Sequence, residues 1–172
     1  MKQFDIKSVY TEWREMKKLT VKESTMATYT SNAEKHILPL LGSVSHIDET
    51  LMQDFVLKLT DSGLSPRTVK DIFLVLRMLM EFGRKRGMTE WRDWDVKMPQ
   101  CAAAPKITVL THAQQKTLMT HLRRHFSFRG LGLYICLCTG MRIGEVCALK
   151  WGDIDVRSRL IKVERTIERI YA

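Results

Sequence analysis

The sequence has 172 residues, a net charge of +9 and 45% hydrophobic residues. This length suits one large domain or two small ones, and the apolar content is ordinary for a chain that buries a core. Because the chain contains no run of about eighteen apolar residues, a membrane-spanning helix is excluded and we expect no membrane partner. Its first residues lack the apolar core of a signal peptide, so we expect a cytoplasmic protein.

The positive charge is distributed unevenly along the chain. Residues 1–99 hold 16 Lys and Arg against 14 Asp and Glu, a net charge of +2, whereas residues 100–172 hold 12 against 5, a net charge of +7. A uniformly basic region is typical of a surface that meets a polyanion such as nucleic acid. Charge alone does not identify that partner, so it gains meaning only beside a motif.

Four helices are predicted in the first part of the chain. We expect them over residues 5–18, 22–38, 48–60 and from 65 to about 87. Asp48 and Ser65 suit N-caps, Pro66 suits the first helical position, and Pro39 with Gly42 should end the second helix. Stops are also expected near residues 63 and 87, where glycines stand. The predicted core-facing residues are Phe4, Val9, Trp13 and Met16 in the first helix, Met26, Tyr29, Ala33 and Ile37 in the second, and Val69, Ile72, Phe73, Leu76, Leu79, Met80 and Gly83 in the fourth.

A second unit is predicted after a linker over residues 88–107, which have no helical period. Thr111 and Gln114 form a capping box, so a helix should run from about His112 to Arg124. Residues 128–139 favour a buried helix and residues 144–149 a short one, while the alternation over 160–167 favours strands. The four cysteines (Cys101, Cys136, Cys138 and Cys147) form no C-x-x-C pair, and we expect reduced core thiols rather than a disulfide or a metal site.

The most informative segment is residues 139–154, which read T-G-M-R-I-G-E-V-C-A-L-K-W-G-D-I. It resembles the first arginine box of the tyrosine recombinases, the phage-integrase family, whose pattern is T-G-x-R-x-x-E-x-x-x-L-x-W-x-D-[IV]. Every fixed position of that pattern is filled. The resemblance implies a mainly α chain: a four-helix SAM-like core-binding domain over residues 1–99, with a linker to about 107, followed by an incomplete α+β catalytic domain over residues 108–172.

The resemblance also assigns the catalytic residues Arg142 and Glu145. In this family a tyrosine attacks a DNA phosphodiester and forms a 3′-phosphotyrosyl intermediate, so neither a nucleotide cofactor nor a metal is expected. Arg142 would donate two parallel hydrogen bonds to the phosphate oxygens, and Glu145, three residues later on the same helix face, would orient it. Without the motif, the same pair would be an ordinary surface ion pair. Leu149 and Trp151 are interpreted as packing residues that fix the turn, and Gly140 as a position of close backbone approach.

Other parts of a recombinase active site are missing from the sequence. The family's β-hairpin lysine, H-x-x-R box and nucleophilic tyrosine lie downstream of the first arginine. Tyr171, the only tyrosine after Arg142, is too near to be the nucleophile, and Lys162 is left unassigned. His112, His121 and His125 precede Arg142 and are interpreted as solvent-facing or packing residues. We therefore expect a truncated chain that binds DNA but is inactive alone.

The expected partners are double-stranded DNA and, in the intact protein, other recombinase protomers. In the family, the second and fourth helices of the core-binding domain face the major groove, which implies a set of candidate DNA-binding residues. These are Lys22, Thr25, Thr28, Arg67, Thr68 and Lys70. The basic line formed by Lys70, Arg77 and Arg84 has a plainer interpretation as a solvated helix surface.

Two alternatives remain open at this point. One is a natural short DNA-binding protein that occupies recombination sites and modulates recombination; a stop codon directly after codon 172 would support it, and a continued reading frame would exclude it. The other is a helical transcription regulator or interaction bundle, which leaves Arg142 and Glu145 unexplained.

Overall fold

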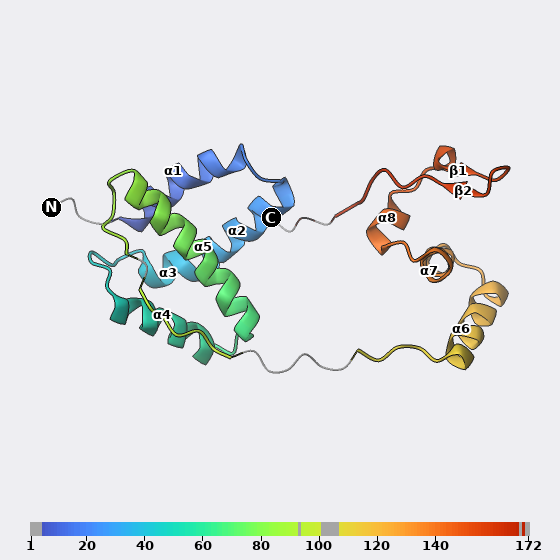
Figure 1. The fold of residues 1–172 in the computed structure, drawn as a ribbon, viewed down its shortest axis with the longest axis horizontal. Helices are drawn as coiled ribbons and strands as arrows, with labels where there is room; N and C mark the ends of the chain where they lie inside the picture. Colours follow the sequence, from blue (N-terminus) through green and yellow to red (C-terminus); the bar gives the residue numbers. More distant parts are fainter. Residues whose placement is uncertain (1–4, 93, 101–106, 169, 171–172) are drawn as a thin grey trace. The chain divides into compact units, whose positions relative to one another are not determined.

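The structure is a computed structural model that describes residues 5–92, 94–100, 107–168 and 170. The chain divides into two compact units: unit 1 comprises residues 1–104 with 170–172, and unit 2 comprises residues 105–169 (Figure 1). The architecture is mainly α-helical, with one small two-stranded sheet in unit 2. The expected fold class, a helical domain followed by a partial α+β domain, is confirmed.

Unit 1 begins with α1 (Ile6–Lys18), whose start is fixed by Asp5. The Asp5 carboxylate accepts the Lys7 backbone N–H at 3.0 Å, which satisfies a helix-end donor, and it also accepts the Ser8 hydroxyl at 2.6 Å. The predicted stripe is partly wrong, because Met16 is exposed and the buried side chains of α1 are Ile6, Val9, Tyr10 and Trp13. Phe4 lies outside the described residues.

The second helical segment extends further than predicted. It comprises α2 (Glu23–Asn32), a π-helical turn η1 (Ala33–Ile37) and α3 (Leu38–Leu41). Pro39 does not end the helix, which corrects the sequence interpretation. The Leu38 N–H bonds back to the Ala33 carbonyl, five residues earlier, so the chain starts a new helical turn in which proline takes an early position and needs no N–H donor. Gly42 is the C-cap, as expected.

The remaining helices of unit 1 begin where the sequence predicts. In α4 (Glu49–Asp61), Asp48 accepts the Leu51 backbone N–H at 2.8 Å. In α5 (Pro66–Lys85), Ser65 caps the helix and Pro66 takes the first position. Gly63 and Gly87 follow the two helices in the left-handed region, as their φ angles of 81° and 65° require.

The core of unit 1 is built around α5, which packs against α1, α2, η1 and α4. The predicted stripe of α5 is confirmed, since all its members are buried except the half-buried Phe73, and Val75 joins them. The stripe of the second helix is likewise buried apart from the half-buried Tyr29. This continuous apolar interior gives unit 1 its own core.

The described residues between 88 and 98, predicted to be the start of a linker, pack against the core of unit 1. Trp91 is only 5% exposed, its ring meets the ring of Trp94 edge-on at 4.8 Å, and both pack with the core of unit 1. The Gln53 side chain also exchanges two hydrogen bonds with the backbone of Lys97, at 2.9 and 3.2 Å. Sequence periodicity misses such a segment because side chains rather than regular backbone hydrogen bonds hold it.

Unit 2 contains three helices and the small sheet (Figure 1). They are α6 (His112–Arg124), α7 (Phe128–Thr139), α8 (Ile143–Cys147), a 3₁₀ turn η2 (Trp151–Asp153), β1 (Ile154–Asp155) and β2 (Leu160–Ile161). The Thr111–Gln114 capping box of α6 is confirmed. The antiparallel strands pair Ile154 with Ile161, so the predicted strand over 160–167 is regular only at its start.

Burial is shallow in unit 2. Its apolar residues are half-buried or exposed, including those of α7, which was predicted to be a buried helix. The same holds for the cysteines: Cys136 is half-buried and Cys138 and Cys147 are exposed free thiols, so the prediction of core thiols is wrong for these two. Cys101 lies outside the described residues. In the part of the chain that the structure describes, no helix is long and apolar enough to span a membrane.

A candidate active-site arginine and nucleic-acid interface

The arginine motif begins where α7 ends. Gly140 caps α7 in the left-handed conformation with φ of 73°, and its N–H bonds to the Cys136 carbonyl at 2.9 Å. A Cβ at this position would meet nothing within 4 Å, so the glycine serves its φ angle and not the predicted close approach. Thr139 supports the turn, because its hydroxyl donates to the Ile135 carbonyl and accepts the Met141 N–H. The chain therefore reverses sharply just before Arg142.

Arg142 and Glu145 are in contact. The Glu145 carboxylate accepts the Arg142 backbone N–H at 2.9 Å and the guanidinium Nη1 at 3.2 Å. Arg142 is the N-cap of α8 with extended backbone, so the two residues do not share a helix face as predicted. They form one of the two hydrogen bonds of a capping box: the side chain of the third helical residue, Glu145, accepts the backbone N–H of the N-cap residue, Arg142. An arginine side chain has no acceptor to complete the other half.

The pair is asymmetric in its exposure. The Arg142 side chain is 87% exposed, whereas the Glu145 side chain is 22% exposed. The carboxylate is thus fixed beside α8 while most of the guanidinium projects into solvent. The guanidinium contacts Glu145 through Nη1, which leaves the other nitrogens of the guanidinium fork for further hydrogen bonds. An exposed guanidinium can donate paired hydrogen bonds to an anion.

Gly144 is a position of close approach that sequence reasoning missed. A Cβ there would lie 2.7 Å from the Thr166 Oγ1 and 2.8 Å from the Ile167 carbonyl oxygen. The Gly144 carbonyl also accepts the Ile167 N–H at 3.0 Å. The segment after β2 therefore returns against α8 and supports the turn that carries Arg142. The family pattern allows any residue at position 144, so the sequence indicated this close approach only by the presence of a glycine.

Asp153, the last acidic residue of the motif, organises the start of the small sheet. Its carboxylate accepts the Lys150 N–H at 2.8 Å and bonds the Arg165 guanidinium, while its carbonyl accepts the Lys162 N–H at 2.8 Å. The Lys150 hydrogen bond first, and then the bond from Arg165, hold the pKa of Asp153 below its ordinary value. A structural role accounts for this residue.

The structure also tests the sequence interpretations of several other residues around the motif. Trp151 is 87% exposed and so does not pack to fix the turn as predicted, although Leu149 is half-buried. Lys162 follows β2 and pairs with Glu164 at 2.6 Å. Tyr171 lies outside the described residues. His112, His121 and His125 are exposed on and after α6, which agrees with the solvent-facing interpretation.

The candidate DNA-binding residues occupy two helices of unit 1 that pack against each other, α2 and α5. Lys22 is the exposed N-cap of α2, and Arg67 and Lys70 are exposed in the first turns of α5. The Thr68 hydroxyl is hydrogen-bonded to Ser65 at 2.7 Å, and the exposed Thr28 donates to the Ser24 carbonyl at 3.1 Å. Thr25 is half-buried. Lys22 and Arg67 are therefore better placed than the threonines to contact a ligand.

Two other features of the described residues were considered as functional sites: a metal-binding cluster and the basic line of α5. Among them, no group of three or more His, Cys, Asp or Glu side chains is placed to hold a metal ion. Within the basic line of α5, Arg84 forms an ion pair with Glu81 at 2.9 Å, which favours the solvated-surface interpretation for that member. The distinctive feature of the chain remains the arginine turn between α7 and α8.

Comparison with known protein families decides the identity of this turn. The family model "Phage integrase, N-terminal SAM-like domain" matches residues 6–60, and the model "Phage integrase family" matches residues 108–170. The two matches together cover more than half of the chain and include the whole arginine motif. The chain belongs to the phage integrase family. It is thus a member of the tyrosine recombinases, as its motif predicts.

Individual relatives agree with this assignment. The integrase chain is 26% identical over 166 residues to an integrase of Saccharopolyspora erythraea, a match that covers 92% of this chain and 37% of the relative. It is 24% identical over 165 residues to a tyrosine recombinase XerC-like protein of Caldanaerobacter subterraneus subsp. tengcongensis, covering 91% of this chain and 42% of the relative. The integrase chain therefore spans about two fifths of the length of these relatives.

Solved structures confirm the fold. Two structures of the Tn1549 transposon integrase in complex with circular intermediate DNA match 95% of the integrase chain, with TM-scores of 0.72 and 0.75. A third, in complex with transposon right end DNA, matches with a TM-score of 0.71. The sequence identity is 20% in each case, and the matches cover 53 to 55% of the solved chains. At this identity the similarity establishes the shared fold.

Proposed function

We propose that this chain supplies the DNA-binding region and the first active-site arginine of a site-specific tyrosine recombinase, an integrase that cuts and rejoins DNA through a 3′-phosphotyrosyl intermediate. The observation that carries the proposal is the exposed Arg142 guanidinium held by Glu145 at 3.2 Å inside the complete family motif. In the proposal, residues 1–99 are the core-binding domain, a linker runs to about residue 107, and residues 108–172 belong to the catalytic domain.

The chemistry proposed for Arg142 follows from its shape and surroundings. Attack on a phosphodiester passes through a pentacoordinate phosphorus with added charge on its nonbridging oxygens, and a planar guanidinium donates two parallel hydrogen bonds to such oxygens. Donors held ready for developing charge each supply ~3–4 kcal/mol of transition-state stabilisation. Glu145 is the positioning residue, because it ties both the backbone and the side chain of Arg142 to the start of α8.

Duplex DNA is the proposed substrate and partner, with other recombinase protomers completing the functional assembly. Exposed cations at the starts of α2 and α5 support DNA binding by unit 1: Lys22, Arg67 and Lys70. The solved integrases of similar fold were captured with DNA, which agrees with this partner. Thr25, Thr28 and Thr68 stay in the proposed interface as neighbours of these cations.

Binding is tested by fluorescence anisotropy of a labelled duplex, titrated with the 172-residue chain at several salt concentrations. Each phosphate contact contributes about 0.9 to the slope of log K against log salt, so replacing Arg67 and Lys70 by Ala should flatten the slope by roughly one to two units. Lys18→Ala with Lys58→Ala removes the same charge from exposed positions on α1 and α4 and serves as the control. An equal effect of both pairs would remove Arg67 and Lys70 from the interface.

Cleavage requires residues beyond those placed in the arginine turn. Because Tyr171 is the only tyrosine after Arg142, we propose that these 172 residues bind DNA without turnover of their own. Incubation with a duplex that carries the recombination site should give no covalent protein–DNA adduct on a denaturing gel. An adduct that disappears with Tyr171→Phe would contradict this part of the proposal.

A further inference from the structure

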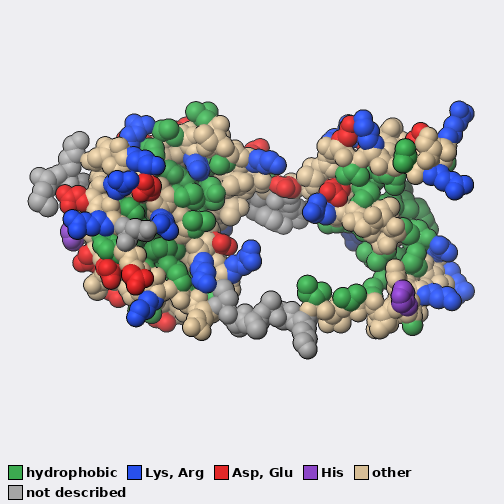
Figure 2. Space-filling view, viewed as in Figure 1, with side chains coloured by type: hydrophobic (Ala, Val, Ile, Leu, Met, Phe, Trp, Pro, Cys, Tyr) green, Lys and Arg blue, Asp and Glu red, His purple; other side chains and the backbone are tan. Residues whose placement is uncertain are grey.

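A basic surface on unit 2 lies apart from the arginine turn. Sequence positions 96–144 contain no Asp or Glu, yet they hold seven Lys or Arg residues and three His. Lys and Arg side chains with His gather over α6 and the turn that follows it (Figure 2). Six neighbouring residues line one open hollow on this face, which we name the α6 basic face: Lys116, Thr117, Thr120, His121, Arg124 and His125.

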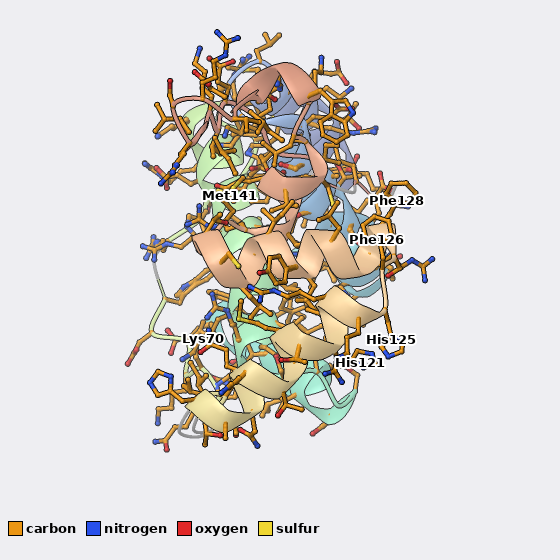
Figure 3. All side chains as sticks on the ribbon, turned by 90° about the vertical axis from the view of Figure 1, so that its right-hand side faces the viewer. Lys70, His121, His125, Phe126, Phe128 and Met141 are labelled. Carbon is orange, nitrogen blue, oxygen red and sulfur yellow. The ribbon has the colours of Figure 1, made fainter. Side chains whose placement is uncertain are left out.

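These six residues share one side of α6 because they fall at helical spacing. The other side of the helix carries the half-buried Leu118, Met119 and Leu122 and packs against α7. The imidazole rings of His121 and His125 lie close together at the end of the helix, with centroids 4.5 Å apart and ring planes tilted by 35° (Figure 3). The face therefore lies on the solvent side of α6 and carries two cations, Lys116 and Arg124, beside the histidine pair.

The cations of this face are not occupied by acidic partners. Among the residues that the structure describes, neither Lys116 nor Arg124 forms a salt bridge. Several other cations of the chain pair with a Glu two or three residues away in sequence. Arg123 differs, because its guanidinium donates to the Tyr134 hydroxyl at 2.6 and 2.9 Å and thereby ties α6 to α7. The helix thus uses one arginine for packing and leaves the neighbouring cations to solvent.

This face is separate from the site of Arg142. Helix α7 packs against both α6 and α8, and Met141, next to Arg142, lies across α7 from His121 and His125 in Figure 3. The α6 basic face and the arginine turn therefore lie on different sides of α7. The threonine hydroxyls donate to the Ala113 and Lys116 carbonyls, so the charged and imidazole side chains would make the contacts.

We propose that the α6 basic face binds the phosphate backbone of duplex DNA as a second, sequence-independent contact surface of this integrase. The proposal rests on the function proposed above, which makes DNA the partner. Lys116 and Arg124 neutralise phosphates, and the imidazole N–H groups of His121 and His125 donate hydrogen bonds to phosphate oxygens. A metal ion is disfavoured at the histidine pair, because the flanking cations repel it and a third ligand is missing from the described residues around it.

The test compares duplex DNA binding by the 172-residue chain and its Lys116→Ala/Arg124→Ala variant across salt concentrations. Loss of two phosphate contacts should flatten the slope of log K against log salt by about two units and weaken binding roughly tenfold at low salt. The Lys18→Ala/Lys58→Ala control, with the same net charge, should keep the wild-type slope. The charge-retaining Lys116→Arg/Arg124→Lys variant should bind like the wild type, since backbone phosphates accept either cation.

An unchanged slope in the Lys116→Ala/Arg124→Ala variant would overturn the proposal. If the charge-retaining variant weakened binding as much as the alanine variant, α6 packing rather than charge would be responsible, and the proposal would also fail. These failures are distinguishable from a failure of the proposed function. If only the α6 basic face is wrong, Arg67→Ala/Lys70→Ala still weakens binding; if the function is wrong, the wild-type chain shows no salt-dependent DNA binding.

Discussion

The support of the arginine turn is open to a test with paired glycine substitutions. In Gly144→Ala the new Cβ would lie 2.7 Å from the Thr166 Oγ1 and 2.8 Å from the Ile167 carbonyl oxygen, far inside ordinary contact, so the backbone after β2 must shift. Overpacking of this kind costs about 1–3 kcal/mol. Gly144 is the second residue of the short helix α8, so the gain from replacing glycine by alanine is at the low end, about 0.5 kcal/mol, which leaves a net local loss of roughly 0.5–2.5 kcal/mol.

Gly132→Ala is the matched control within the same unit. A Cβ at Gly132, inside α7, would meet only the Val146 Cγ1 at 3.8 Å, which is ordinary van der Waals contact. The same chemical change should therefore stabilise α7 by about 0.5–1 kcal/mol. The two substitutions differ in the sign of their effect, and this difference follows from the packing around each glycine.

Amide hydrogen exchange followed by mass spectrometry measures both effects locally. A loss of roughly 0.5–2.5 kcal/mol in Gly144→Ala should speed exchange in peptides that cover residues 143–149 and 162–168 by roughly 2- to 70-fold. Gly132→Ala should slow exchange in peptides from α7. Unchanged or slower exchange around α8 in Gly144→Ala would refute the close contact between α8 and the segment after β2.

Three further results are expected. Trp91→Ala should destabilise unit 1 by about 3–5 kcal/mol in chemical denaturation, because it empties a buried site, whereas Trp151→Ala should change stability by less than about 0.5 kcal/mol. Asp5→Ala should cost about 1 kcal/mol at pH 7 through the lost cap of α1. Hydrogen bonds from Ser8 and the backbone lower the pKa of Asp5. This stabilisation is therefore complete above the ordinary pKa of 3.8 and is lost as the pH falls through the lower folded pKa, so variant and wild type should converge in thermal melts below that folded pKa. Glu145→Ala should speed amide exchange of Arg142 and α8, since the acceptor of the Arg142 N–H is removed; unaltered exchange would show that the capping contact contributes nothing.

Local signals in the sequence predicted most of the helical framework. Ser65 followed by Pro66, and Thr111 with Gln114, place helix starts through hydrogen bonds that involve only a few neighbouring residues. The motif likewise identified Arg142 and Glu145 as partners. Their contact arises from an N-cap rather than from a helix face, because the turn at Gly140 delays the start of α8.

Features that depend on distant packing were not predictable in the same way. Trp91 belongs to the core of unit 1 because of side-chain contacts that leave no periodic pattern in its segment. Pro39 continues a helix because a π-helical turn precedes it. Trp151 and the exposed cysteines of unit 2 have apolar neighbours in sequence, but burial depends on which segments cover them in space.

The most direct test of the central claim concerns Arg142 as the phosphate-binding arginine. Arg142→Lys is introduced into a complete recombinase that carries this segment, and single-turnover DNA cleavage and DNA affinity are measured together. Lysine keeps the charge, and with it the pairing with Glu145, but loses the bidentate fork. We predict a cleavage rate lower by roughly 10²–10³, equivalent to ~3–4 kcal/mol, with DNA affinity nearly unchanged. Near-wild-type cleavage by Arg142→Lys would contradict the catalytic assignment.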